Sequence, residues 1–237
     1  MQLELAAPLL QDQLLAVRIE AARAVSAFRA NLPVPFEEAF RVAEQELIEA
    51  MQAIAERPEA HGNLAGNYVE AGNVELALRE FRTALRMDPG SVQARANLAD
   101  FYRRLDRDDD AETLLREGFE ITSNNAALHH SLGLLLIRDG RADEGLEELR
   151  LAAGEGKDNA RYQYVYAVAL NSLDQPEAAV ELLMSSKNRF PADFDIHWAL
   201  ATILRDQGRN DAAKAIAEEM AERYPGMPAV QNLLESL

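Results

Sequence analysis

The sequence contains no cysteine among its 237 residues. This absence excludes disulfides, thiolate metal sites, CxxCH haem attachment and cysteine nucleophiles in this chain, although it leaves the redox compartment open. Basic residues are outnumbered, with 24 Lys and Arg against 40 Asp and Glu, and the formal net charge at pH 7 is -16. Because nucleic acids and anionic membranes bind clustered Lys and Arg, neither is expected as a partner. The acidity favours solubility and, secondarily, a basic partner.

Long apolar runs are also lacking. No stretch approaches the roughly 20 apolar residues of a membrane span, so no membrane insertion is expected. The first residues, MQLELAAPLLQDQLLAV, lack the basic n-region and the cleavage site of a signal peptide. The abrupt start is also compatible with a fragment, which leaves the compartment open. Aromatic residues make up only 6% of the chain, and the dominance of Ala and Leu favours an all-α fold.

A frame of 34 residues recurs without a gap from residue 58 to residue 227, and each unit has the pattern of two amphipathic helices. Positions 8 and 20 of every unit hold Ala or Gly, such as Ala65 and Ala77 in the first unit. Small residues there let the two helices approach closely. Proline at position 32, as in Pro89, ends the second helix. The five units are 58–91, 92–125, 126–159, 160–193 and 194–227.

This pattern resembles the tetratricopeptide repeat (TPR), closely over residues 58–227 and loosely over 36–57. The resemblance implies a right-handed superhelix, an α-solenoid in which each repeat contacts only its neighbours. Residues 36–57 are then expected to form a degenerate half-repeat helix that caps the array, and residues 228–237 a C-terminal capping helix. Ser123 and Lys157 replace the terminating proline in the middle of the array, so looser helix ends are expected there.

Residues 1–30 precede the array and carry apolar side chains at helical spacing. Their arrangement of an aspartate, a Val-Arg pair and an Ala-Ala pair resembles the second half of a HEAT repeat, at Asp12, Val17, Arg18, Ala21 and Ala22. A HEAT-like helical segment is therefore expected. Residues 31–35 form a linker, because two prolines stop a helix there.

A second resemblance covers the order of several segments. The HEAT-like segment, RPEAHGNLAGNY, RYQYVYAVAL and ALATILRDQGR together resemble the C-terminal region of bacterial multihaem cytochrome c proteins that append HEAT and TPR repeats. This resemblance implies an accessory docking or assembly domain of an exported redox enzyme, without its haem-bearing part because the chain has no Cys. Such a parent would place the chain in the periplasm, and otherwise a cytoplasmic location is expected.

In TPR proteins the first helix of each repeat lines a concave groove. The groove positions turn from small and polar, as at Gly62, Asn63 and Gly66, to apolar and aromatic in repeats three to five. We expect the chain to be a protein–protein interaction scaffold that binds a peptide or protein segment there. The alternative is that the C-terminal helix or a second copy of the chain covers this surface. The predicted groove residues are Leu134, Ile137, Tyr164, Val168, Asn171, Trp198, Thr202 and Arg205.

The histidines suggest a metal site, but their spacing argues against one. His61, His129 and His197 all occupy position 4 and lie two repeats apart, too far to share an ion at ligand distances near ~2 Å. They are expected to pack between helices. The acidic run 106–110 lacks the spaced oxygens and the glycine of a calcium loop, and Glu148 is expected on a solvated helix face. No nucleophile motif or phosphate-binding glycine loop is present, so we expect neither enzymatic activity nor a cofactor.

We predict that folding requires no metal ion. A structural ion such as zinc contributes on the order of ten kcal/mol to the folding of a small domain, so its removal would lower the melting temperature sharply. Treatment with EDTA should leave the Tm unchanged in a melt followed by circular dichroism. A large drop that a divalent ion reverses would contradict the packing role of the three histidines.

Overall fold

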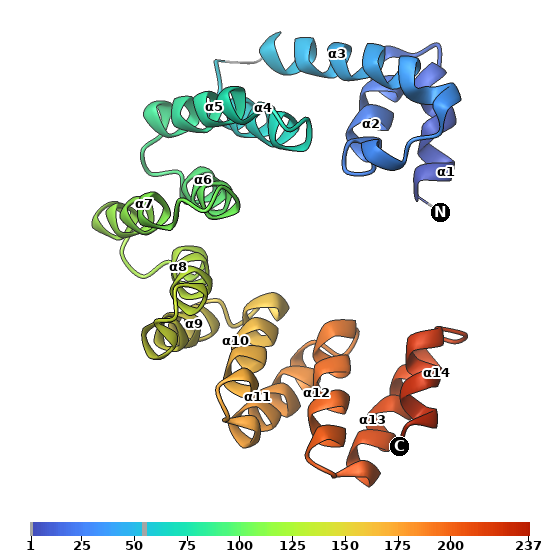
Figure 1. Cartoon of the computed structure of the whole chain (residues 1–237), viewed down its shortest axis with the longest axis vertical. Helices are drawn as coiled ribbons and strands as arrows, with labels where there is room; N and C mark the ends of the chain where they lie inside the picture. Colours follow the sequence, from blue (N-terminus) through green and yellow to red (C-terminus); the bar gives the residue numbers. More distant parts are fainter. Residues whose placement is uncertain (1, 54–55) are drawn as a thin grey trace. The chain divides into compact units, whose positions relative to one another are not determined.

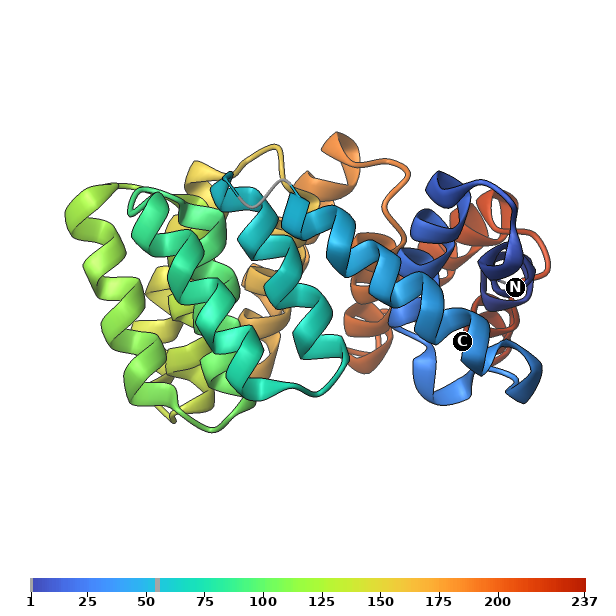
Figure 2. The ribbon, with the colours of Figure 1, turned by 90° about the horizontal axis from the view of Figure 1, so that it is seen from above.

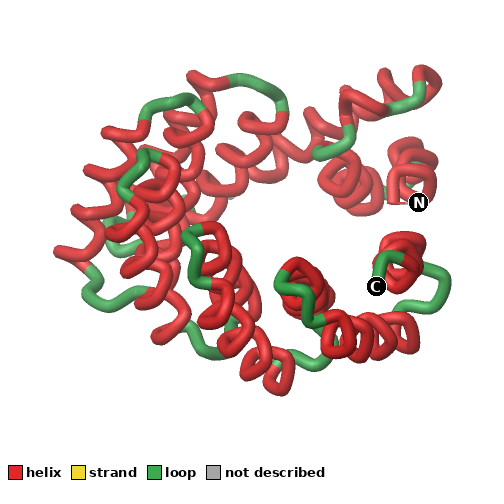
Figure 3. Tube along the Cα trace, turned by 60° about the horizontal axis from the view of Figure 1, so that its bottom comes forward, coloured by secondary structure: helices red, strands yellow, loops and turns green. Residues whose placement is uncertain are grey.

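The computed structural model describes residues 2–53 and 56–237 of the chain (Figure 1). Helices and connecting loops account for these residues, and no strand is present among them (Figure 3). The expected all-α fold is confirmed. The chain divides into two compact units, Met1–Arg107 and Asp108–Leu237, here called unit 1 and unit 2. No helix within the described ranges is long and apolar enough to cross a membrane.

Unit 1 joins the N-terminal segment to the first repeat. Helix α2 packs on α3, and α3 in turn contacts α4, so that Leu10, Val25, Leu47 and Leu64 share one buried cluster. The HEAT-like assignment stays a prediction, and residues 1, 54 and 55 of the expected segments lie outside the described ranges. The elements are α1 Gln2–Ala6, η1 Ala7–Gln11, α2 Leu15–Ser26, η2 Arg29–Asn31, η3 Val34–Phe36, α3 Glu37–Ala53, α4 Pro58–Glu70, α5 Val74–Met87 and α6 Val92–Arg104.

Unit 2 is a run of helices that pack on their neighbours in the chain. The hairpins α8–α9, α10–α11 and α12–α13 follow one another, and α14 packs against α13 (Figures 1 and 2). The buried cluster at its C-terminal end includes Leu183, Leu200 and Leu233. The elements are α7 Asp108–Ile121, α8 Ala126–Arg138, α9 Ala142–Glu155, α10 Ala160–Ser172, α11 Pro176–Arg189, α12 Phe194–Asp206, α13 Asn210–Arg223 and α14 Pro228–Glu235.

The helices keep one register through all five repeats. The first helix always spans positions 1–13 of the 34-residue frame and the second spans positions 17–30. The second helix ends at position 30 in every repeat, including the two in which Ser123 or Lys157 replaces the proline of position 32. The expectation of looser ends there stays a prediction. After α7, Asn124 adopts a left-handed backbone conformation with φ of 55°, which turns the chain without a proline.

Two recurring turns set this register. The turn inside each hairpin needs a left-handed residue at position 15, where glycine carries no steric penalty. Glycine supplies it in three repeats and aspartate in the other two, at Gly72, Asp106, Gly140, Asp174 and Gly208.

The turn between repeats ends in a helix cap at position 34. A short polar side chain there accepts a hydrogen bond from a backbone N–H two or three residues later, which satisfies one of the unpaired donors of the next helix. The capping residues are Ser91, Asn125, Asn159 and Asp193.

The two helices of repeat three, α8 and α9, approach so closely that only glycine fits at their crossing. A Cβ atom added to Gly145 would lie 2.7 Å from Cγ1 of Ile137 and 2.8 Å from the carbonyl oxygen of Gly133. A Cβ atom on Gly133 would lie 2.8 Å from Cγ of Leu149. The backbone of α8 therefore has no room to accept a methyl group from α9.

We predict that Gly145→Ala destabilises the protein although alanine is the better helix former by about 1 kcal/mol. Overpacking at the crossing should cost about 1–3 kcal/mol, which exceeds that gain. Gly66→Ala is the control, because no atom lies within 4 Å of a Cβ at this helical position, and it should be neutral or stabilising. Urea unfolding of both variants measures the difference, and equal stabilisation by the two would refute the packing argument.

Candidate functional site

The predicted groove residues form a repeated stripe on the first helices of unit 2. Helices α8, α10 and α12 carry them at positions 5, 9 and 12 of their repeats, a spacing that places them on one face of each helix. On α10 the stripe consists of Tyr164, Val168 and Asn171. Each of the eight side chains reaches the surface at least in part, and Val168 is 37% exposed although it is apolar.

Four of the eight residues line one hollow between α8 and α10, here called the groove pocket. Leu134 and Ile137 come from α8, and Tyr164 and Val168 come from α10. The hollow has a volume of about 280 Å³ and a mainly apolar lining. The sequence had not singled out its remaining lining residues, which are Leu149, Val165, Ala169, Ser172 and Leu173.

Those additional residues have two origins. Val165 and Ala169 lie on α10 next to the predicted stripe, so a wider choice of groove positions could have included them. Leu149 belongs to the second helix α9, and no rule about first helices could have found it. It reaches the groove pocket because Gly133 lets α9 lie directly against α8.

Trp198 lies outside the groove pocket and belongs partly to the core of unit 2. Its ring stacks on Phe194 with centroids 5.8 Å apart, and Phe194 meets Tyr224 edge-on at 5.3 Å. The Tyr224 hydroxyl donates a 2.7 Å hydrogen bond to the carbonyl oxygen of Ala192, which fixes this aromatic group. Trp198 is therefore half-buried and held in one orientation.

The remaining predicted residues also lie outside the groove pocket. The Thr202 hydroxyl lies 2.9 Å from the carbonyl oxygen of Trp198, a hydrogen bond within its own helix. The Arg205 guanidinium pairs with Asp206 at 2.8 Å. Asn171 is exposed on α10. The polar groups of Thr202 and Arg205 on α12 are thus already engaged by their neighbours.

The polar part of the predicted groove, in unit 1, is hollow as well. Gly62 and Gly66 lie one turn apart on α4 and border two hollows of about 250 and 300 Å³ together with Glu70 and Asn97. No atom lies within 4 Å of a Cβ added to either glycine, so the space above α4 is open. Burial raises the pKa of the Glu70 carboxyl, an effect that a hydrogen bond with Ser26 partly offsets.

The three histidines at position 4 lie within helical hairpins and hydrogen-bond through Nδ1. His61 meets Oε2 of Glu80 at 2.6 Å, and His129 meets Oε2 of Glu148 at 2.5 Å. His197 instead contacts the carbonyl oxygen of Asp193 at 2.7 Å. In residues 2–53 and 56–237 no group of three or more His, Cys, Asp or Glu is arranged to hold a metal ion.

The carboxylate partners of His61 and His129 share repeat position 23 on the second helix, at Glu80 and Glu148. The expectation that Glu148 lies on a solvated face is wrong, because it is only partly exposed and pairs with a buried histidine. Position 4 is polar in every repeat, and the nonhistidine cases also find partners. Arg95 donates to the carbonyl oxygen of Pro89 at 3.0 Å, and Gln163 donates to that of Ala153 at 2.7 Å.

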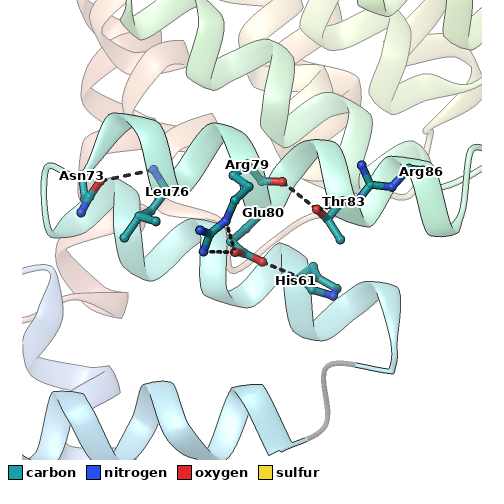
Figure 4. Close-up of polar contacts among 7 residues, drawn as sticks. All are labelled: His61, Asn73, Leu76, Arg79, Glu80, Thr83 and Arg86. Atoms are coloured by element: carbon teal, nitrogen blue, oxygen red, sulfur yellow. Dashed lines mark hydrogen bonds and ion pairs between the residues drawn. The ribbon is translucent and has the colours of Figure 1, made fainter.

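Of the two glutamates at position 23, Glu80 accepts the larger number of hydrogen bonds (Figure 4). It is only 7% exposed, and it accepts hydrogen bonds from Arg79 at 2.7 and 2.9 Å in addition to its contact with His61. Burial by itself raises the pKa of the Glu80 carboxyl, but the hydrogen bonds with His61 and Arg79 outweigh burial and leave this pKa below its usual value. The ionised carboxylate therefore ties α4 to α5.

We predict that Glu80→Gln destabilises the protein by about 1–2 kcal/mol at neutral pH. Because the folded-state pKa of Glu80 lies below its unfolded value near 4.3, its stabilising contribution is fully present above that pH and is lost as the pH falls through the folded pKa. The Tm difference between wild type and Glu80→Gln, measured from pH 7 to 3, should thus shrink below about pH 4.

Glu75→Gln on the exposed first turn of α5 serves as the control. It removes one carboxylate from the same helix, and its effect on the Tm should be small throughout this pH range. A Glu80→Gln effect that stays unchanged down to pH 3 would show that the charge of Glu80 does not stabilise the hairpin.

Comparison with known proteins supports the repeat assignment. Tetratricopeptide repeat family models match residues 68–135 and 185–228. A comparison with curated protein sequences found no match.

Several solved structures have a similar fold. PilW, a widely conserved type IV pilus biogenesis factor, has a TM-score of 0.66 and 16% identity, covering 94% of this chain and 99% of PilW. PilF of Pseudomonas aeruginosa has a TM-score of 0.62 and 22% identity, covering 76% of this chain and 82% of PilF. YrrB, a TPR protein with an unusual peptide-binding site, has a TM-score of 0.55 and 14% identity, covering 79% of this chain and 96% of YrrB.

At these identities the likeness shows the fold alone. The relation to multihaem cytochromes and the handedness of the superhelix stay predictions. The family-model matches and the structural neighbours agree with the uniform register of the helices within each repeat. The chain contains tetratricopeptide repeats and has a TPR-type helical repeat fold.

Proposed function

We propose that the chain is a non-catalytic protein–protein interaction scaffold that binds a peptide or protein segment on the first helices of repeats three to five. The groove pocket is the observation that carries this proposal. Leu134, Ile137 and Val168 give it an apolar lining in a chain of net charge -16, and Val168 remains 37% exposed. Apolar side chains gathered at an open hollow favour a binding role over a purely structural one.

The occupant that fits this lining is a segment with an apolar side chain. Two side chains from α8 and two from α10 surround the hollow, so one inserted side chain would contact both repeats. Tyr164 adds a large aromatic surface, and aromatic residues are enriched among those that dominate binding energies. Trp198 would extend the contact with the bound segment along α12. Because its ring already stacks on Phe194, binding would cost little further side-chain entropy at Trp198.

The fold supports this proposal. TPR-type repeats suggest an interaction scaffold, and YrrB, which has a similar fold, is a TPR protein with an unusual peptide-binding site. The acidic surface would favour a partner segment that carries basic residues beside its apolar anchor, because opposite charges speed association.

A second candidate is an accessory docking domain of an exported multihaem cytochrome c. It rests on the resemblance of the HEAT-like segment and the segments RPEAHGNLAGNY, RYQYVYAVAL and ALATILRDQGR to such proteins. The genomic reading frame upstream of the first codon tests it directly. CxxCH motifs in that frame would favour a periplasmic redox parent, and an immediate upstream stop codon would reject it.

We predict that Tyr164→Ala and Trp198→Ala weaken binding of a partner that has been captured by affinity purification and identified by mass spectrometry. Truncating a true anchor typically costs about 2 kcal/mol or more, which is roughly thirtyfold in Kd by isothermal titration calorimetry. Val168→Asp places a charge on the same surface and should weaken binding at least as much. Val168 is 37% exposed, so this variant should remain folded, which a melt followed by circular dichroism checks.

Asn63→Ala in unit 1 is the control and should change the affinity much less. The competing interpretation is that the aromatic side chains only pack between helices. If Trp198→Ala lowers the Tm steeply while the folded protein binds normally, and Val168→Asp also binds normally, the groove is not the binding site.

A further inference from the structure

Unit 2 contains a second hollow, of about 360 Å³, among α9, α10 and α11. It shares no lining residue with the groove pocket, because its walls come from the second helices α9 and α11 and from the first turns of α10. We call it the α9–α11 pocket. Its size lies at the lower end of the range for small-ligand sites.

The α9–α11 pocket collects positive charge in an acidic protein. Arg150, Lys157 and Arg189 line it, and no aspartate or glutamate does. Arg150 pairs with Glu147 at 2.6 Å, so these two charges cancel. Arg189 donates a 2.9 Å hydrogen bond to the carbonyl oxygen of Lys157, and within the described ranges neither Arg189 nor Lys157 pairs with a carboxylate. Lys157 and Arg189 therefore line the hollow without a carboxylate partner in those ranges.

Buried hydrogen-bond donors accompany these cations. Ser186 is only 5% exposed and lines the pocket, and its hydroxyl makes no hydrogen bond to another side chain or carbonyl in the described part of the chain. The Ser186 hydroxyl is not one of the buried side-chain atoms that lack a partner, so it reaches solvent in the pocket and is open to a ligand. Burial raises the pKa of the Tyr166 phenol, which therefore stays protonated at neutral pH and can donate.

The net charge of the site selects the kind of anion. Helices α9 and α11 both end at this pocket, and each helix C-terminus carries roughly half a negative charge. Against the two cations of Lys157 and Arg189, this leaves about one positive charge. A monoanion matches that balance better than a phosphate dianion does.

Apolar residues also line the pocket, together with the polar Gln163 and Ser185. Phe190 and Leu182 line one side, and Gly154 has open space where a side chain would project. We propose that the α9–α11 pocket binds an organic carboxylate attached to an apolar body. The carboxylate would meet Lys157, Arg189 and the Ser186 hydroxyl, while the apolar body would rest on Phe190. The same chemistry occurs in a free aromatic or aliphatic acid and in the C-terminal residue of a peptide.

Matched pairs of probes test this proposal on the full chain. We would titrate the ¹⁵N-labelled protein with 3-phenylpropionate, with the uncharged 3-phenylpropionamide and with inorganic phosphate, and follow the backbone signals of Gly154 and Tyr166. The carboxylate should shift these signals saturably, and the amide should bind at least about tenfold more weakly, as expected for the loss of a charged hydrogen bond. Equal binding of acid and amide, a response to phosphate alone or no response would each overturn the proposal.

A second pair of probes distinguishes the two sources of the carboxylate. The peptide acetyl-Gly-Gly-Phe with a free C-terminus is compared with its C-terminal amide. If the peptide with the free C-terminus binds more tightly than 3-phenylpropionate, the natural source of the carboxylate is a chain terminus. If this peptide binds more weakly, the source is a free acid. Both outcomes support a carboxylate site, provided that the peptide amide binds no better than 3-phenylpropionamide.

Two variants connect binding to the named side chains. Lys157→Met should weaken binding of 3-phenylpropionate about tenfold. Lys214→Met, which removes the same charge from an exposed position of α13, should not weaken it. Ser186→Ala provides an independent test within the buried part of the pocket and should lower the affinity severalfold. Unchanged affinity in both Lys157→Met and Ser186→Ala would refute the assignment.

Discussion

The structure depends on the close approach of the two helices within the hairpins α4–α5, α8–α9, α10–α11 and α12–α13. Positions 8 and 20 hold Ala or Gly in all five repeats, and at the crossing of α8 and α9 even a methyl group finds no room. This contact brings the larger residues of both helices into one seam and holds the two helices in a fixed relation.

The same packing explains why the surfaces of unit 2 carry hollows of different character. Leu149 on α9 reaches the groove pocket because α8 and α9 are in near contact at Gly133 and Gly145. Helices α9 and α11 border a second hollow, where Lys157 and Arg189 gather near two helix C-termini. A single repeat geometry thus presents an apolar surface on its first helices and a basic hollow along its second helices.

Polar residues inside the hairpins show a further consequence of tight packing. A buried polar group costs free energy unless it finds a partner. Position 4 meets this requirement in different ways, by a carboxylate for His61 and His129 and by a backbone carbonyl for Gln163 and His197. Metal ligation is therefore not needed to explain why histidine recurs at this position. Glu80, Glu148 and the carbonyl oxygen of Asp193 satisfy the three histidines with atoms that the chain itself supplies.

The sequence alone determined the helical repeat, its 34-residue frame and the stripe of groove residues, because small residues, turn glycines and helix caps act locally and recur at fixed spacing. It did not reveal that Asp106, Asn124 and Asp174 would take left-handed conformations, since those residues adopt several backbone states. Only the tertiary structure decided that Leu149 lines the groove pocket, that Trp198 stacks on Phe194, and that Glu148 hydrogen-bonds with His129. Each of these contacts joins residues of different helices or depends on side-chain orientation, and the distances between helices are set by packing rather than by sequence spacing.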